Sequence, residues 1–240
     1  MAETSSLELV LVHGGWSDGS CWSSVISHLM DVGIEASAAQ LPLSSFDEDV
    51  MALRHHLEAR QGKTILVGHS YGGLVMTQVG GESAQTVGLV YVAASIPLPG
   101  EGLGSFLLKN PGAYQAQFTP DKNGLLWASE GVFAEGLAQD LCSRQRRLLV
   151  SVQKPLSAAI FGANISVEGW RNKPCWYLIS EDDRILSPTT QRALAHKINA
   201  KTGMVSGGHM SPISQPKKVA QFLQEVAIER DPDYQPTFRW

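Results

Sequence analysis

The residues best suited to covalent chemistry surround Ser70. An apolar run at 65–67 leads into Gly68–Gly72, which has the pattern Gly-x-Ser-x-Gly, and a helical stretch follows. Such a pattern between a strand and a helix places the serine at the apex of a sharp turn, with its hydroxyl exposed. The backbone N–H of Tyr71 points to the same place. The pattern therefore predicts a nucleophile, Ser70, and one donor of an oxyanion hole, the Tyr71 amide.

A serine hydroxyl becomes a good nucleophile only when a base takes its proton, and that base is usually a histidine oriented by a carboxylate. His209 follows a predicted strand at 202–206 and two glycines, which permit a turn that directs its ring toward Ser70. We therefore predict His209 as the base. Of the other histidines, four lie within predicted helices, and two belong to loop motifs where we expect them to pack or hydrogen-bond (His28, His55, His56 and His196; His13 and His69).

The carboxylate is expected directly after a predicted strand at 174–180, where Glu181, Asp182 and Asp183 follow one another. Asp183 lies deepest in the turn that leads to the next helix, and we prefer it for this reason. Asp182 stays an alternative, because three adjacent acids leave the choice ambiguous. Glu181 is expected to face solvent.

The second oxyanion donor is expected from the loop after the first strand. His13, Gly14 and Gly15 follow an apolar run at 7–12, and the Gly15 N–H can lie opposite that of Tyr71. The loop lacks the Gly-x-Gly-x-x-Gly spacing and the downstream acid of a dinucleotide site. The three cysteines are unpatterned and lack the spacing of metal ligands. We therefore expect neither a cofactor nor a metal.

These residues need a scaffold, and the hydrophobic pattern supplies one. Predicted strands alternate with predicted helices along most of the chain (strands at 7–12, 34–41, 63–67, 86–94, 174–180 and 202–206; helices from about 20, and at 46–57, 71–80, 188–198 and 214–227). This alternation is typical of βαβ units, so we expect a parallel sheet covered by helices on both faces. Ligands of such sheets bind beyond the carboxyl ends of the strands, where Ser70 and the loop at 13–15 are predicted to lie.

The pattern changes between residues 97 and 171, where Gly and Pro are frequent and helical stretches are short, the best at 142–153. We interpret this segment as an insertion that forms a small helical cap over the site, and the strip at 144–147 as a solvated helix face. Nine apolar side chains there could line a cavity or simply fold the cap (Phe106, Leu107, Leu108, Phe118, Leu125, Trp127, Phe133, Phe161 and Trp170).

Composition limits the remaining classes. The 240 residues are 43% apolar and 18% charged, with a net charge of −4, which is typical of a globular protein and argues against a nucleic-acid surface. No apolar run is long enough to span a membrane, and the run at 7–12 is too short for a signal sequence. We expect a cytoplasmic protein with one domain at 1–230, a tail at 231–240, and reduced core cysteines at positions 21, 142 and 175.

Four segments together make the chain resemble a small member of the α/β-hydrolase superfamily over most of residues 7–228 (Val12–Trp16, Gly68–Gly73, Glu181–Ile185 and Gly208–Met210). Within it, the chain is most similar to compact esterases of the plant methylesterase and hydroxynitrile lyase group and their bacterial relatives. The resemblance implies a triad of Ser70, Asp183 and His209, oxyanion amides from Gly15 and Tyr71, and a helical cap. Three features depart from it. Gln40 stands where an acid usually precedes Leu-Pro, the first strand corresponds to what is usually the third, so that we expect a trimmed sheet of about six strands, and the acid loop has one extra residue.

The leading hypothesis is a carboxylic ester hydrolase that cleaves an ester or lactone of a small, mainly apolar molecule through an acyl-enzyme on Ser70. A lyase or isomerase that acts on a small metabolite with the same triad is the first alternative. A non-catalytic small-molecule receptor is the second. We expect a small molecule as the partner, with neither nucleic acid nor membrane, and leave open whether the protein is a monomer or a homodimer.

Overall fold

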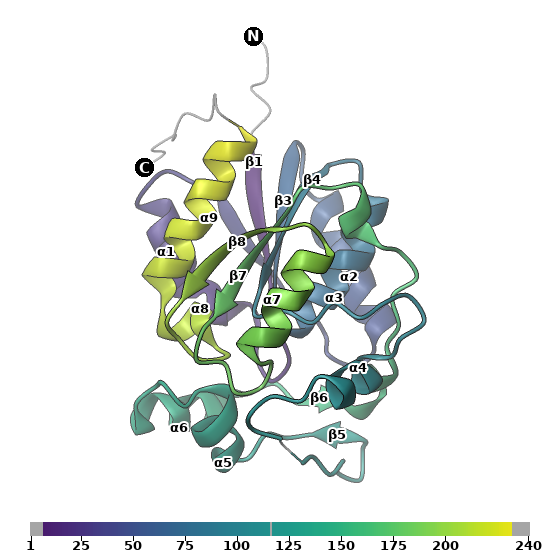
Figure 1. Ribbon diagram of the computed structural model, residues 1–240, viewed down its shortest axis with the longest axis vertical. Helices are drawn as coiled ribbons and strands as arrows, with labels where there is room; N and C mark the ends of the chain where they lie inside the picture. Colours follow the sequence, from purple (N-terminus) through teal and green to yellow (C-terminus); the bar gives the residue numbers. More distant parts are fainter. Residues whose placement is uncertain (1–6, 116, 232–240) are drawn as a thin grey trace.

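A single sheet organises the computed structural model, which describes residues 7–115 and 117–231 (Figure 1). Its six strands are all parallel, in the order β2-β1-β3-β4-β7-β8 (β1 Leu7–Val12, β2 Ala36–Ala39, β3 Lys63–His69, β4 Thr86–Val92, β7 Cys175–Ser180 and β8 Lys201–Val205). The predicted parallel sheet of about six strands is therefore confirmed. The second strand is shorter than the predicted 34–41, since only residues 36–39 pair with β1.

Helices cover both faces of this sheet (Figure 1). One face packs against α1 and α9, and the other against α2, α3 and α7 (α1 Ser23–Met30, α9 Pro216–Arg230, α2 Phe46–Glu58, α3 Tyr71–Glu82 and α7 Pro188–Lys197). Successive side chains of a strand point to opposite faces, so Leu9 and Leu11 join the first core while Val10 and Val12 join the second. Burial on both faces explains why the central strands are nearly continuous apolar runs.

The topology places two loops side by side at the carboxyl edge of the sheet. β1 lies between β2 and β3, so the chain crosses to one neighbour first and to the other afterwards. Val12, at the end of β1, is in register with Gly68, next to the end of β3. A crevice forms at such a switch point, because the two connecting segments leave in opposite directions. The loop at 13–16 and Ser70 border this crevice.

The 97–171 segment connects β4 to β7. It contains short elements joined by irregular chain (α4 Leu103–Lys109, β5 Leu125–Leu126, α5 Glu130–Val132, a π turn at Phe133–Leu137, α6 Ser143–Val152, β6 Leu156–Ser157 and 3-10 turns at Ala158–Gly162 and Gly169–Arg171). Figure 1 places α4, α5, α6, β5 and β6 together at the end of the molecule to which the strands point. Two short helical elements of the remaining chain complete the fold (a 3-10 turn at Gly19–Trp22 and α8 at Ser211–Ser214).

Two expectations about single residues were wrong. Cys142 is exposed rather than buried, because it immediately precedes α6, where its N–H donates to the side chain of Gln145. Trp127 is 52% exposed and does not enter the interior of the segment. Cys175 is buried as expected, and burial raises the pKa of its thiol to about 12.

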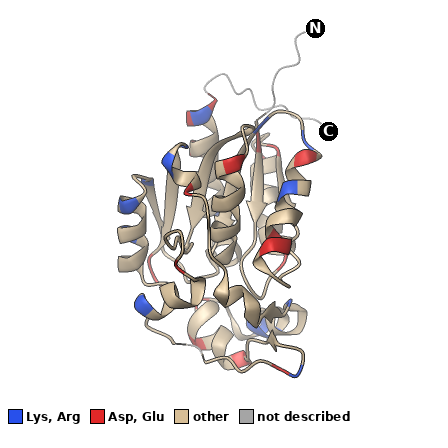
Figure 2. Ribbon diagram, turned by 90° about the vertical axis from the view of Figure 1, so that its right-hand side faces the viewer, with Lys and Arg blue, Asp and Glu red and all other residues tan. Residues whose placement is uncertain are grey.

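Charge is spread over the surface. Figure 2 shows basic and acidic residues interspersed on the side that it displays. Within residues 7–115 and 117–231, no helix has both the length and the apolar character needed to cross a membrane. Residues 1–6 and nearly all of the predicted tail at 231–240 lie outside the described residues.

Candidate active site

Ser70 lies between the end of β3 and the start of α3 in a strained backbone conformation. Its φ of 52° and ψ of −122° are unusual for a residue other than glycine. Glycines on either side make the turn possible. A Cβ on Gly68 would lie 2.7 Å from the backbone of Gly73, and one on Gly72 would lie 2.5 Å from the carbonyl oxygen of Val12. Helix, strand and the end of β1 therefore meet tightly around Ser70.

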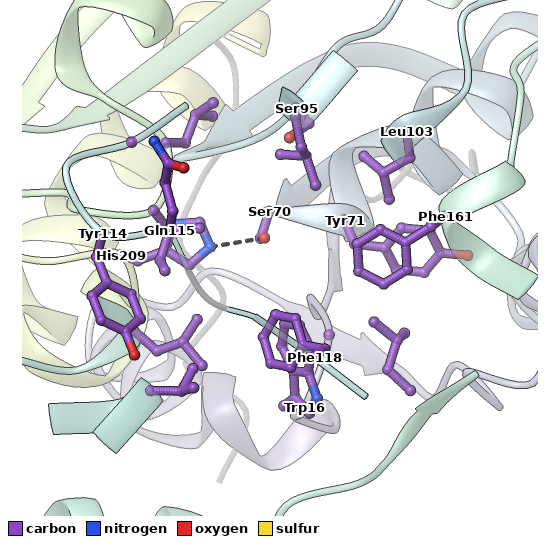
Figure 3. A pocket seen from close by; sticks show the side chains of 18 of the residues that line it. Trp16, Ser70, Tyr71, Ser95, Leu103, Tyr114, Gln115, Phe118, Phe161 and His209 are labelled. Carbon is purple, nitrogen blue, oxygen red and sulfur yellow. Dashed lines mark hydrogen bonds between the residues drawn. The ribbon is translucent and has the colours of Figure 1, made fainter. Parts of the chain in front are cut away.

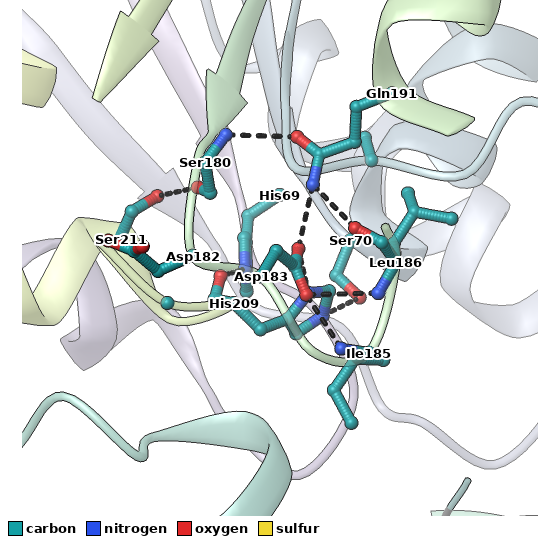
Figure 4. Close-up of polar contacts among 12 residues, drawn as sticks. His69, Ser70, Ser180, Asp182, Asp183, Ile185, Leu186, Gln191, His209 and Ser211 are labelled. Atoms are coloured by element: carbon teal, nitrogen blue, oxygen red, sulfur yellow. Dashed lines mark hydrogen bonds and ion pairs between the residues drawn. The ribbon is translucent and has the colours of Figure 1, made fainter. Parts of the chain in front are cut away.

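A chain of two hydrogen bonds joins Ser70, His209 and Asp183 (Figure 4). The His209 Nε2 lies 2.8 Å from Ser70 Oγ, and its Nδ1 lies 2.8 Å from Asp183 Oδ2. Because an ionised carboxylate only accepts hydrogen bonds, Nδ1 carries the proton and Nε2 offers its lone pair to the serine hydroxyl. His209 and Asp183 are each 3% exposed. The arrangement can move the Ser70 proton to His209.

The structure distinguishes the three adjacent acids. Asp183 turns inward, whereas Asp182 and Glu181 are exposed and do not contact His209. The carbonyl oxygen of Asp182 instead accepts a hydrogen bond from Gln139.

The Asp183 carboxylate is held by four donors. Oδ1 accepts from the amides of Ile185 and Leu186 at 2.8 and 2.9 Å, and Oδ2 accepts from Gln191 Nε2 at 2.9 Å and from His209. Gln191 lies on α7 and is fully buried. Its Nε2 also donates to the carbonyl oxygen of Leu186, and its Oε1 accepts a hydrogen bond from the Ser180 N–H. Gln191 was not predicted from the sequence, where its only signal is a polar residue within a predicted helix at 188–198.

His69 is a second buried ring beside the site. Its Nε2 donates to the carbonyl oxygen of His209 at 2.8 Å, and the two ring centroids are 5.1 Å apart. Burial lowers the pKa of His69 to about 3, so the ring is neutral at pH 7. The expectation that His69 packs or hydrogen-bonds is therefore confirmed, and its partner is the loop that carries His209.

The two predicted oxyanion donors border the same cavity as Ser70. Tyr71 is the first residue of α3, where backbone N–H groups have no acceptor within the helix. Gly15 follows β1, and within the described part of the chain it makes no hydrogen bond. A Cβ on Gly14 would lie 2.9 Å from Ser70 Cβ, so this glycine lets the first loop pass directly beside the serine.

A cavity of about 580 Å³ opens above Ser70 (Figure 3). Its lining is mostly apolar and contains no Asp, Glu, Lys or Arg among the described residues. Leu103 and Phe161 lie on one side of Ser70, and Tyr114 lies on the side of His209. Trp16 and Phe118 stack with ring centroids 4.6 Å apart. Four of the nine apolar residues singled out by sequence line this cavity, whereas two others are buried in core clusters (Leu107, Leu108, Phe118 and Phe161; Phe106 and Phe133).

The 97–171 segment also hydrogen-bonds to the loops that carry His209 and Asp183. The Gly208 amide donates to Asp140 Oδ2 at 2.8 Å, and the Met210 amide donates to the carbonyl oxygen of Leu137 at 3.1 Å. On the acid loop, Arg184 O accepts from the amide of Tyr114 at 2.8 Å. Within residues 7–115 and 117–231, no group of three or more His, Cys, Asp or Glu side chains is placed to hold a metal ion.

Fold and site together define a class of protein. Residues 9–222 match the sequence model of the alpha/beta hydrolase family, and the chain belongs to this family. The predicted resemblance to α/β-hydrolases of the esterase group is thereby confirmed.

Named relatives cover nearly the whole chain. The probable hydrolase R7 of Phoma sp. is 25% identical over 91% of this chain and 97% of its own length. Methylesterase 1 of Arabidopsis thaliana is 24% identical over 94% of this chain and 97% of its own length. The crystal structure of polyneuridine aldehyde esterase is similar with a TM-score of 0.80 at 19% identity, over 92% of this chain and 99% of its own, and supports the fold. The names of the sequence relatives support a hydrolase.

Proposed function

We propose that the protein is a carboxylic ester hydrolase that cleaves an ester or lactone of a small, mainly apolar molecule through an acyl-enzyme on Ser70. The observation that carries the proposal is the hydrogen-bonded chain from Ser70 through His209 to Asp183 at the floor of an apolar cavity. Relatives named hydrolase, esterase and methylesterase favour the same reaction class.

Each proposed residue has one task. Ser70 Oγ attacks the substrate carbonyl while its proton passes to His209 Nε2, and the new oxyanion accepts hydrogen bonds from the Gly15 and Tyr71 amides. His209 gives the proton to the leaving oxygen as the C–O bond breaks. Water then attacks the acyl-enzyme with His209 as base, which releases the acid and restores Ser70. Asp183 accepts a hydrogen bond from His209 Nδ1 and keeps the His209 ring in the required tautomer.

The lining of the cavity indicates the substrate class. A volume of about 580 Å³, whose described lining residues carry no charged side chain, suits a neutral, mainly apolar molecule. The leaving alcohol must depart next to His209, so it occupies the side of Tyr114, and the acyl group occupies the side of Leu103 and Phe161. We propose that the 97–171 segment is the cap of a single domain at 1–230 and sets this specificity.

A panel of p-nitrophenyl esters with increasing acyl length tests the proposal, with Ser70→Ala as the inactive control. Turnover by the wild-type protein, improving from acetyl to longer acyl chains, is expected. Phe161→Ala is expected to raise KM for the longer chains more than for acetate. A wild-type protein that turns over no member of the panel would contradict the esterase assignment.

Labelling with an alkyl fluorophosphonate tests the nucleophile directly. Ser70 Oγ displaces fluoride, and intact-mass spectrometry is expected to show one phosphonyl group per chain, absent in Ser70→Ala. Turnover of a substrate that survives Ser70→Ala would instead support the lyase or isomerase alternative. Tight binding of an apolar ligand with neither turnover nor labelling would support a receptor.

A further inference from the structure

Asp49 is a buried carboxylate outside the hydrogen-bonded chain of Ser70, His209 and Asp183. It lies in the first turn of α2 and is completely inaccessible to solvent. Its Oδ2 accepts a hydrogen bond from the Tyr71 hydroxyl at 2.7 Å, and its Oδ1 accepts one from the Leu43 amide at 2.7 Å. Burying a carboxylate is costly unless donors saturate it, so these two contacts are the ones that hold Asp49 in the core.

Tyr71 connects Asp49 to the nucleophile. Its backbone N–H is a proposed oxyanion donor directly after Ser70, while its phenol end is buried and tied to α2. Burial and the neighbouring Asp49 raise the pKa of Tyr71 far above its usual range, so the hydroxyl stays a donor. The buried hydrogen bond restricts how far Tyr71 can move, and with it the backbone N–H next to Ser70.

Leu43 connects Asp49 to the other side of the site. Leu43 has a φ of 61°, a left-handed conformation that is unfavourable for a leucine. The hydrogen bond from its backbone N–H to Asp49 Oδ1 helps to hold this conformation. Two residues earlier, the Leu41 amide donates to His13 Nε2 at 3.0 Å, and the His13 Nδ1 donates to the carbonyl oxygen of Gly14 at 2.9 Å. The 41–43 loop is therefore linked to the loop that carries Gly15, the second proposed donor.

The same loop anchors the 97–171 segment. The Ser157 amide donates to the carbonyl oxygen of Leu43 at 2.9 Å, and the Lys154 ammonium donates to that of Leu41. The 41–43 loop thus hydrogen-bonds to the 97–171 segment, to His13 and to Asp49, and Asp49 is the side chain that joins this loop to Tyr71.

From these contacts we infer that Asp49 is a positioning residue for the oxyanion hole, acting through the Tyr71 hydroxyl and the Leu43 amide. The inference rests on the proposed function, because it gives Asp49 a role in stabilising the tetrahedral intermediate. A purely structural Asp49 would stabilise α2 and the 41–43 loop and leave the reaction itself unchanged. The two roles differ in what they do to binding of a tetrahedral adduct.

The test uses Asp49→Asn and Tyr71→Phe, with Tyr91→Phe as a matched control. Tyr91 is also a buried tyrosine with a hydroxyl partner, Thr77 Oγ1 at 2.9 Å, but it lies away from the cavity lining. The readouts are kcat and KM for a p-nitrophenyl ester, the affinity of an alkylboronic acid that forms a tetrahedral adduct on Ser70, and the melting temperature. Because Tyr71→Phe keeps the Asp49–Leu43 bond, it provides a test even where Asp49→Asn fails to fold.

We expect Asp49→Asn and Tyr71→Phe each to lower kcat by about 10- to 100-fold, less than the loss of a whole oxyanion donor, with KM nearly unchanged. Boronate affinity should fall by the same factor as kcat. Tyr91→Phe should lower the melting temperature, while its kcat and its boronate affinity stay within about twofold of wild type. A melting temperature that falls while kcat and boronate affinity hold in both Asp49→Asn and Tyr71→Phe would overturn the inference.

Fluorophosphonate labelling separates failure of this inference from failure of the proposed function. A wild-type protein that is labelled on Ser70, together with Tyr71→Phe labelled at the same rate, would overturn the role of Asp49 and leave the esterase proposal intact. Slower labelling of Tyr71→Phe than of both wild type and Tyr91→Phe would support it. A wild-type protein that is not labelled would overturn both proposals.

Discussion

At the scale of single residues, the two neighbouring carboxylates Asp182 and Asp183 differ only in their surroundings. Asp183 is 3% exposed and accepts four hydrogen bonds, whereas Asp182 faces solvent. The Asp183 carboxylate accepts a hydrogen bond from His209 Nδ1, which sets the tautomer of the ring. Substitution of each acid in turn therefore separates the effect of the hydrogen bond to His209 from that of a nearby negative charge.

Asp183→Asn is expected to lower kcat by a factor on the order of 10⁴, because an amide beside Nδ1 favours the wrong His209 tautomer. Asp182→Asn, one residue away and exposed, should keep kcat within about twofold of wild type. Steady-state rates on a responding p-nitrophenyl ester measure both. Equal losses in the two variants would assign the orienting role to neither residue in particular.

His69→Leu is expected to cost about 1–3 kcal/mol in the free energy of unfolding, because the buried carbonyl oxygen of His209 loses its donor. His69→Gln can place an amide nitrogen near the same oxygen and should lose less. Urea unfolding at pH 7 measures both variants. A glutamine variant as unstable as the leucine variant would argue that ring packing, rather than the hydrogen bond, matters at this position.

At the scale of elements, the crossing of β3 and α3 depends on residues without a side chain. Gly68→Ala would bring a Cβ to 2.7 Å from the Gly73 backbone, so we expect a loss of about 1–3 kcal/mol or more in stability and a displaced Ser70. Gly162→Ala is the control, since a Cβ there meets nothing within 4 Å. Melting temperature and esterase rate should both fall in the first variant only. An unchanged melting temperature in Gly68→Ala would contradict this account of the turn.

At the scale of the whole molecule, two buried neutral histidines make stability depend on pH. Burial lowers the pKa of His13 to about 4 and that of His69 to about 3, whereas an unfolded histidine titrates near 6.5. The unfolded chain therefore binds more protons below pH 6.5, and stability is lost as pH falls from 6.5 toward 4 and 3. The loss approaches about 1.4 kcal/mol per pH unit for each histidine.

Urea unfolding at pH 7 and pH 5 tests this dependence, and His69→Gln should have a shallower dependence because it removes one titrating group. Asp49 acts in the opposite direction. Its pKa is raised by burial, so its protonation between the folded-state pKa and 3.8 favours the folded state and offsets part of the loss. A free energy of unfolding that does not change between pH 7 and pH 5 would contradict the neutral, buried state of the two histidines.

Much of this molecule could be predicted from the sequence because the relevant signals are local. Strands and helices follow from the alternation of apolar residues over short windows, and the turn around Ser70 follows from glycines within five residues. Parallel strands bring their carboxyl ends to one edge, which was enough to predict that Ser70, His209 and one acid after β7 would meet. Their catalytic roles stay predictions.

Only the tertiary structure decided which buried polar groups pair. His69 and His209 are 140 residues apart in the chain, and Asp49 and Tyr71 belong to different helices. Buried donors and acceptors that lose their hydrating water must form hydrogen bonds with one another. Because the partners are far apart in the chain, no local sequence pattern indicates which groups will pair. The same reason separates Asp183 from Asp182. The shape of the cavity also came from packing, since the 97–171 segment has only short, irregular elements and is held by contacts such as the stack of Trp16 on Phe118.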